Sequence, residues 1–473
     1  MLHYGLSHKP RSGKVLTVSP SQQNRPVQAA ESSDSLNTKD LRRILGSSFL
    51  GSVIEYYDFI LYATAASLIF DKVFFGNLTP GLALFASFGT LAVGYIARPL
   101  GGIIFGHFGD RLGRKKMLVL SMMMMGVATV AIGLLPTTAS IGVAAPIILI
   151  LLRVVQGIAV GGEWGGATLM ALEHAPASKR GFAASFANAG APAGGLLATF
   201  LVSFISFATG DGFLEWGWRI PFIFSAVLII IGMVVRLKVA ETPIFQEMDA
   251  KAAERNQERK TPIALVLKNH SRTVIITLIA SLGFYTCQGV LTSWGVSQAV
   301  AGGVDRSFVL NTKGYAAVAT IVFCLVAAKL SDKYGRKAVL TVGGTAGILW
   351  ALPAVFLMSN GTGWGFALAV IVGSGVIQGI LAGPIGAYIS ELFPADVRYT
   401  GASLAYQGSS TLGAGFTPMI CTALAVSFGI VSVGIFWVAI LIIGLIAIRM
   451  SPEGAVLPSK TDISGKTKEK LSA

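Results

Sequence analysis

The chain has 473 residues, of which 53% are hydrophobic and only 13% carry a charge. A soluble domain uses about 25% charged residues to cover its surface, so this composition excludes a soluble globular protein and indicates one that resides in a lipid bilayer. The net charge of +14 does not require a nucleic-acid partner, because basic residues of membrane proteins collect in cytoplasmic loops.

The first 40 residues are polar and lack apolar periodicity, so they are predicted to form a disordered tail. They carry no cleavable signal pattern. Twelve apolar stretches follow, each near or above the roughly 20 residues that a helix needs to cross the hydrocarbon core. The predicted spans are residues 45–70, 81–105, 116–135, 144–171, 181–207, 217–236, 272–298, 310–330, 337–358, 363–389, 400–425 and 428–449.

Lys and Arg are distributed unevenly between the two sets of loops. When basic residues near the ends of spans are counted with the adjacent loops, the two tails and the loops after even-numbered spans hold 31 of the 37 basic residues and the other loops hold four. The remaining two, Arg98 and Arg153, lie deeper within spans. Because cytoplasmic loops carry the excess of basic residues, both termini are predicted to be cytoplasmic.

An internal repeat divides the spans into two halves. The segment 110–115 after span 2 recurs at 332–337 after span 8, and the Glu-Pro-Arg pattern of 173–180 recurs at 391–398. Duplicated halves surround the binding site of alternating-access transporters. We therefore predict an all-α membrane protein with twelve transmembrane helices in two pseudo-symmetric six-helix bundles. Its predicted parts are a cytoplasmic tail (1–40), a first bundle (41–236), a cytoplasmic linker (237–271), a second bundle (272–449) and a second cytoplasmic tail (450–473).

The loop sequence at 106–115 resembles a motif of the major facilitator superfamily. Within that superfamily the chain resembles the metabolite:proton symporters, which include shikimate, α-ketoglutarate, citrate and proline/betaine carriers, and it is most similar to the shikimate type. The other segments that carry the resemblance are 55–59, 153–157, 161–166, 216–222 and 391–401. The resemblance implies a bacterial inner membrane protein that takes up a small, usually carboxylated metabolite with a proton.

The repeated loops supply a predicted cytoplasmic gate. Gly113 permits a tight bend, and the basic residues Arg114 and Lys115 stand where Glu173 could reach them. The resemblance implies that such pairs, in the first half and at the equivalent positions of the second half, form in one state and part in the other. The predicted gating residues are Asp110, Arg111, Gly113, Arg114, Glu173, Arg180, Asp332, Arg336, Glu391 and Arg398. The alternative is that these charges only set the topology.

Glu55 and Asp58 in span 1 are the predicted proton-coupling residues. Their spacing places both on one helix face near the middle of the membrane, with Tyr62 a turn further along. Charges inside a span are costly, and two close carboxylates in a low-dielectric site do not easily ionise together, so one is expected to hold a proton. The alternative is a structural pair neutralised by Arg98 or Arg153.

Span 4 carries Arg153, Gln156 and Glu163 on one stripe. The Arg153 guanidinium suits bidentate binding of a carboxylate, which makes it a predicted substrate contact unless it is permanently paired with an acidic neighbour. The roles of Glu163 and of Arg98, whose side chain could reach the membrane interface, stay open.

Neutral polar side chains of other spans are predicted to complete the substrate site, although hydrogen bonding between helices is the alternative for each of them. Together with Arg153 and Gln156, the predicted substrate-binding residues are Tyr62, Asn188, Gln288, Gln378, Tyr388 and Gln407. The charged candidates thus lie in the first half, and neutral polar candidates face them from the second.

The favoured function is symport of a proton and a small organic acid, either shikimate-like or a di- or tricarboxylate. A proline/betaine carrier is less favoured because residues 450–473 lack heptads, and a drug/proton antiporter because the glycine–proline spacing at 190–195 departs from its motif. A ligand sensor has less support because the 35-residue linker and the short tails leave little room for a signalling segment, and an enzyme has least support because there is no His/Cys cluster or nucleophile motif. The lack of a phosphate-binding glycine loop of the Gly-Lys-Ser/Thr type indicates that an ion gradient supplies the energy. No metal or cofactor is expected, a monomer suffices mechanically, and sodium in place of protons stays open.

Overall fold

The computed structural model describes residues 38–237 and 262–452, which form helices joined by short loops. The elements of the first half are α1 (Thr38–Leu68), α2 (Phe70–Val73), α3 (Pro80–Leu112), α4 (Arg114–Leu134), α5 (Thr138–Ile141), α6 (Ala144–His174), η2 (Ala177–Lys179), α7 (Arg180–Thr209), η3 (Gly210–Phe213) and α8 (Arg219–Leu237).

The second half contains three π-helical segments, η4 to η6, which interrupt longer helical runs and which in proteins often lie near functional sites. Its elements are α10 (Pro262–Asn269), α11 (Ser271–Gln288), η4 (Gly289–Trp294), α12 (Gly295–Ala301), α13 (Arg306–Tyr334), α14 (Arg336–Ser359), α15 (Gly363–Val370), η5 (Ile371–Gln378), α16 (Gly379–Glu391), α17 (Arg398–Ser410), η6 (Thr411–Gly415), α18 (Thr417–Phe428) and α19 (Ile430–Met450).

Within the described ranges, 11 helical runs are long and apolar enough to cross a membrane, and Arg219–Val235 is a shorter apolar helix. Together they match the twelve predicted spans within a few residues at most ends. The third run, for example, is Lys115–Leu134 where the sequence predicts 116–135. The prediction of an all-helical membrane protein is therefore confirmed.

The predicted polar segments fall mostly outside the described residues, which exclude 1–37, 238–261 and 453–473. Where the structure describes their edges, α1 already begins at Thr38, inside the predicted tail, and α10 occupies part of the predicted linker.

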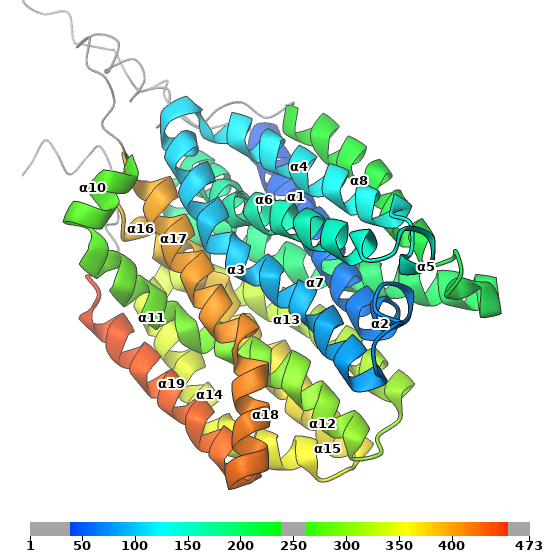
Figure 1. Cartoon of the computed structure of the whole chain (residues 1–473). Helices are drawn as coiled ribbons and strands as arrows, with labels where there is room; N and C mark the ends of the chain where they lie inside the picture. Colours follow the sequence, from blue (N-terminus) through cyan, green and yellow to red (C-terminus); the bar gives the residue numbers. More distant parts are fainter. Residues whose placement is uncertain (1–37, 238–261, 453–473) are drawn as a thin grey trace, which may run out of the picture.

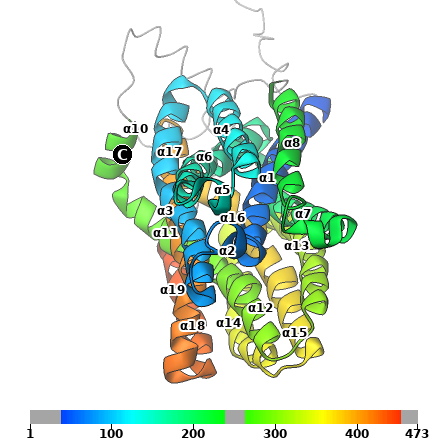
Figure 2. The ribbon, with the colours of Figure 1, turned by 45° about the vertical axis from the view of Figure 1, so that its right-hand side comes forward.

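The helices gather into two groups that lie side by side (Figures 1 and 2). In the first group α1 packs on α7 and α3 on α6, and in the second α14 packs on α19 and α13 on α16. Figure 1 draws the first group in blue to green and the second in green through yellow to red.

Two glycines show the sequence repeat in the structure. Gly113 (φ 105°) alone joins α3 to α4, and Gly335 (φ 93°) alone joins α13 to α14. Positive φ is readily adopted only by glycine, so the bend predicted at Gly113 is confirmed and recurs at the equivalent position. We call the end of the molecule that holds these two joints and the loops 174–180 and 391–398 the motif end.

The two halves are in close contact near the motif end. There α3 packs on α17, and α7 packs on α13 and α16. A Cβ atom on Gly109 of α3 would lie 2.0 Å from the ring of Tyr399 in α17, so the absence of a side chain permits this approach. At the opposite end α2, α12, α15 and α18 pack on elements of their own half.

Candidate functional site

Asp58 of α1 is fully buried inside the first half, in a polar pocket between helices. Thr129 of α4 donates a hydrogen bond to Asp58 Oδ2 at 3.0 Å, and Ser225 of α8 donates to Oδ1 at 2.5 Å. Both carboxylate oxygens therefore have a hydroxyl donor, which compensates part of the cost of burying this group.

A chain of hydrogen bonds connects this carboxylate to a buried guanidinium. Gln156 Nε2 donates to Thr129 Oγ1 at 2.7 Å, and Arg153 Nη1 donates to Gln156 Oε1 at 3.0 Å. Arg153 and Gln156 are 3% and 1% exposed, so this chain of side chains lies in the protein interior, where Asp58 and Arg153 are within electrostatic reach of each other. The structure thus brings together Asp58, Arg153 and Gln156.

Aromatic rings hold the two buried arginines of the first half. The Arg153 guanidinium carbon lies 4.0 Å from the ring centre of Tyr62 and 5.1 Å from that of Phe59. The Arg98 guanidinium carbon lies 4.3 Å from the ring centre of Phe59 and 4.5 Å from that of Tyr95. Arg98 is only 5% exposed, so its side chain is engaged inside the protein and does not extend to the membrane interface.

Glu55 has different neighbours from Asp58 although both lie on α1. Glu55 interacts electrostatically with Tyr285 and Tyr406 of the second half. The next residue of α1, Tyr56, also contacts the second half, because its hydroxyl lies 3.1 Å from the hydroxyl of Tyr406. Glu55 therefore belongs to the seam between the halves, whereas Asp58 belongs to the interior of the first half. Glu163 of α6 is likewise fully buried.

Asp332 joins the two halves at the motif end. Its carboxylate accepts hydrogen bonds from the backbone N–H groups of Gly181 (2.8 Å) and Phe182 (2.9 Å), in the first turn of α7. Arg336 donates to Asp332 at 2.6 Å and to Glu391 at 3.2 Å. A carboxylate at a helix N-terminus satisfies free donors and complements the helix dipole, so this contact stabilises the packing of the two halves at the motif end.

A second link joins Arg398 of α17 to Glu173 of α6 by an ion pair at 3.2 Å. Arg180 lies within electrostatic reach of Glu173 and Glu391. Arg111 is exposed, and its guanidinium lies 3.5 Å from His107 on the same helix. The side chains of the remaining predicted gating residues, Asp110 and Arg114, lie outside the described part of the structure.

The predicted neutral substrate contacts occupy several different places. Asn188 donates to the backbone oxygen of Ala382 at 2.7 Å and Gln407 to that of Gly161 at 3.1 Å, so both bridge the two halves. Tyr62 donates to Thr90 at 2.6 Å.

The other three lie entirely in the second half. Gln378 accepts a hydrogen bond from Ser374 at 2.8 Å, and Gln288 is partly buried at the end of α11. Tyr388 bonds Ser451 after the end of α19 at 2.9 Å, so the structure does not bring it to the charged cluster.

Sequence reasoning missed Thr129, Ser225 and the position of Lys313. A single Thr or Ser in an apolar span carries no signal of its own, since such residues commonly bond the backbone of their own helix. Lys313 lies within α13, and the sequence analysis did not single it out as a candidate site residue. No group of three or more potential metal-ligating side chains occurs among the described residues.

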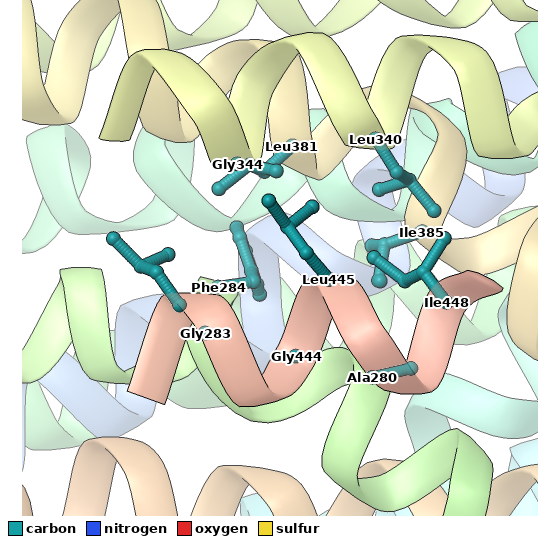
Figure 3. Close-up of a pocket in the computed structure, with 11 residues that line it drawn as sticks. Ala280, Gly283, Phe284, Leu340, Gly344, Leu381, Ile385, Gly444, Leu445 and Ile448 are labelled. Carbon is teal, nitrogen blue, oxygen red and sulfur yellow. The ribbon is translucent and has the colours of Figure 1, made fainter. Parts of the chain in front are cut away.

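A pocket drawn in Figure 3 lies within the second half, apart from these charges. It is lined by apolar residues of α11, α14, α16 and α19, including Phe284, Leu381 and Leu445. Three glycines, at 283, 344 and 444, also line it. With no polar group to orient a charged or hydroxylated ligand, this pocket does not fit the expected substrate.

The sequence of the chain matches the family model for the Major Facilitator Superfamily over residues 48–408. The chain belongs to the major facilitator superfamily. This superfamily member is 40% identical over 418 residues to the inner membrane metabolite transport protein YhjE of Escherichia coli (strain K12), covering 87% of this chain and 94% of the relative.

Two further relatives transport named solutes. The chain is 38% identical over 395 residues to the shikimate transporter of Escherichia coli (strain K12), covering 83% of this chain and 90% of the relative. It is 32% identical over 438 residues to the proline/betaine transporter of Salmonella typhimurium (strain LT2), covering 89% of this chain and 85% of the relative.

The structure is similar to that of the proton:xylose symporter XylE bound to 6-bromo-6-deoxy-D-glucose, with a TM-score of 0.72. The two chains are 18% identical, and the match covers 88% of this chain and 97% of XylE, so it establishes the fold. This member of the major facilitator superfamily is an integral membrane protein and a secondary transporter of metabolites, and it is not an enzyme.

Proposed function

We propose that this transporter takes up a small organic acid together with a proton, by alternating access across the bacterial inner membrane. The motif end and both termini face the cytoplasm, as the distribution of Lys and Arg indicates. The 38% identity to a shikimate transporter supports an organic acid. A single monomer contains every group that the proposal needs.

The hydrogen-bonded chain from Asp58 through Thr129 and Gln156 to Arg153 is the observation that carries the proposal. Buried charges in a membrane are tolerated when they are paired, and they mark proton and substrate pathways. Here an acid that can take up a proton is connected to a cation that cannot lose one, through two neutral side chains.

Proton uptake by Asp58 changes the charge balance of the first half. With Asp58 ionised, the negative carboxylate compensates the Arg153 guanidinium. Once Asp58 is protonated, Arg153 becomes a less compensated buried cation, and an anionic substrate near it restores neutrality. Proton and organic anion therefore favour each other's binding, which is the thermodynamic requirement for symport.

Glu55 is placed to sense the second half, since it interacts with tyrosines of α11 and α17. We assign it a supporting role in coupling across the seam. Gln288 and Gln378 are the second-half side chains that we retain as substrate contacts. Asn188 and Gln407 we assign instead to holding the halves together, because both donate to backbone oxygens of the opposite half.

The gate at the motif end completes the cycle. Asp332 of α13, which accepts hydrogen bonds from the first turn of α7, and the Arg398–Glu173 ion pair both link the halves, and these links support a gate that is closed at the motif end. Release of the substrate to the cytoplasm requires both links to break, while new contacts form at the opposite end.

The test is uptake of radiolabelled shikimate, 2-oxoglutarate, citrate, proline and betaine by the purified protein in vesicles with an imposed pH gradient. We expect Asp58→Asn to lose pH-driven accumulation of the acid substrate but to keep exchange, and Arg153→Gln to lose both. Asp211→Asn, a change of an exposed acid in η3, is the matched control and should behave as wild type. Full pH-driven accumulation by Asp58→Asn would remove Asp58 from coupling.

An osmolyte carrier is the second candidate, because the chain is also 32% identical to a proline/betaine transporter. A zwitterion could use the same buried cation for its carboxylate. Accumulation of proline and betaine, without any of the three acids, would replace the organic-acid proposal by this one.

A further inference from the structure

Lys313 is a cation of the second half that lies inside a membrane-spanning helix. It stands seven residues after the start of α13 and within the apolar run Asn311–Tyr334. Its side chain is partly buried. A lysine within a span is costly unless it faces water or a partner. The direction of the Lys313 side chain therefore decides whether a binding role is plausible.

The exposed side of α13 identifies the direction of the lipid. Tyr315, Val318, Val322 and Val326 are 70%, 52%, 53% and 50% exposed, and they form one apolar stripe. At 3.6 residues per turn, Lys313 lies about 180° around the helix from the middle of this stripe. Its side chain therefore starts toward the interior of the protein and does not extend along the lipid-facing surface.

Contacts on either side of Lys313 refine this direction. Gly314 faces α7 of the first half, where a Cβ atom would lie 3.5 Å from Leu196. Ala316 faces η5, where a Cβ atom on Gly375 would lie 3.4 Å from its backbone oxygen. Lys313 lies between these two directions, so it is aimed at the seam between the first half and η5.

A polar line continues from Lys313 into the protein. Thr320, two turns along α13 on the same side, donates to the backbone oxygen of Ser374 at 3.0 Å. Ser374 in turn donates to Gln378 Oε1 at 2.8 Å, which leaves the amide N–H groups of Gln378 for another acceptor. The Lys313 ammonium itself has no hydrogen bond or ion pair with any residue that the structure describes.

We propose that Lys313 binds the carboxylate of the transported acid from the second half, with the Gln378 amide as a further donor. This inference rests on the proposed function and assigns anion selectivity to the second half. A partly desolvated ammonium without a protein counterion favours a ligand that brings the negative charge. Arg153 and Asp58 then serve the coupling of that anion to the proton.

The first experiment measures counterflow of the best acid of the panel into vesicles at equal pH on both sides, which makes no demand on coupling. We expect Lys313→Gln to raise KM for the acid by about tenfold or more, as for loss of a charge-assisted contact, with a small change in maximal rate. Lys313→Arg should restore most of the affinity. Lys329→Gln removes an exposed lysine of the same helix and should leave KM unchanged.

A neutral competitor tests whether charge is what Lys313 recognises. The methyl ester of the same acid should compete poorly in the wild type and relatively better in Lys313→Gln. An unchanged KM and an unchanged preference for acid over ester in Lys313→Gln would overturn this inference while leaving the proposed function standing. No counterflow of any acid by the wild type would overturn both.

Chemical restoration of the positive charge at position 313 provides a test that does not depend on whether the protein tolerates glutamine there. The three native cysteines, Cys287, Cys324 and Cys421, are buried, so Lys313→Cys can be modified selectively from the solution. Aminoethyl methanethiosulfonate, which rebuilds a cationic side chain at position 313, should lower KM again. The neutral reagent methyl methanethiosulfonate should leave KM raised. Failure of the cationic reagent to react, or reaction without recovery, would contradict the inference.

Discussion

The guanidinium of Arg398 and the carboxylate of Glu173 form a buried ion pair at 3.2 Å that joins the second half to the first. Their side chains are 4% and 0% exposed. Because the two residues belong to different halves, the proposed gate predicts that this pair exists only while the motif end is closed. Its free energy therefore contributes to the conformational equilibrium more than to the stability of either half.

Breaking this pair should open the motif end. Removal of one partner leaves a buried charge uncompensated, which costs about 3–5 kcal/mol in the closed state and much less when water reaches the site. We expect Arg398→Gln and Glu173→Gln each to lower uptake and to increase thiol labelling of a reporter, Ser403→Cys, from the motif end.

Two controls distinguish the ion pair from a general disturbance. The double variant Glu173→Gln with Arg398→Gln leaves no uncompensated charge at this site, so its reporter cysteine should be labelled less than that of either single variant. Arg449→Gln, an exposed basic residue near the same end, should label as the parent does. Equal labelling in all five proteins would show that the pair has no part in gating.

A second prediction uses the close approach of Gly109 to Tyr399. A Cβ atom on Gly109 would meet the ring of the other half at 2.0 Å, whereas one on Gly157 would meet Gly94 O of its own half at 2.4 Å. Gly109→Ala should therefore disfavour only the closed motif end, while Gly157→Ala should lower the stability of the first half in every state.

Thermal unfolding and reporter labelling separate these two effects. We expect a lower Tm for Gly157→Ala, and for Gly109→Ala a Tm near that of the parent with increased labelling of Ser403→Cys. A large loss of Tm in Gly109→Ala without extra labelling would mean that the contact is present in all states.

Much of the architecture was predictable because the physical signals were strong and local. Apolar length located all twelve spans, and the repeated loop motif located the joints at Gly113 and Gly335. Asp58 and Arg153 were predicted as buried charges and are buried. The partners that connect them, Thr129 and Ser225, were not predictable, because a single hydroxyl in a span looks the same whether it serves its own helix or a distant carboxylate.

Pairing across the halves was beyond the sequence for a different reason. The sequence suggested basic residues of the same half as partners of Glu173, and the structure shows an ion pair with Arg398 across the seam, which the sequence did not suggest. Such a contact depends on how two bundles dock, which no local pattern encodes. The contacts of Asn188 and Gln407 were unpredictable for the same reason, because their side-chain amides donate hydrogen bonds to backbone oxygens of the opposite half.

The joint at Gly335 yields a third prediction. Its φ of 93° and ψ of 151° lie in a region that is essentially restricted to glycine, and a side chain there costs about 1–3 kcal/mol. Gly335→Ala should therefore lower Tm and transport. Gly89→Ala, within α3 and with no heavy atom within 4 Å of its Cβ position, is the control and should be neutral or slightly stabilising. A Tm for Gly335→Ala as high as that of Gly89→Ala would refute a structural need for glycine at this joint.

The last prediction concerns Thr129, which both donates to Asp58 and accepts from Gln156. Thr129→Val keeps the shape but removes the hydroxyl, so the link between Asp58 and Arg153 is broken and a buried carboxylate oxygen loses its donor, at a cost of about 1–3 kcal/mol. We expect the accumulation ratio under an imposed pH gradient to fall by about tenfold, and its pH dependence to shift, while counterflow at equal pH persists. Thr129→Ser keeps the hydroxyl and should accumulate as the wild type does. If valine and serine behave alike in both assays, the hydrogen-bonded chain is not the route by which protonation of Asp58 reaches Arg153.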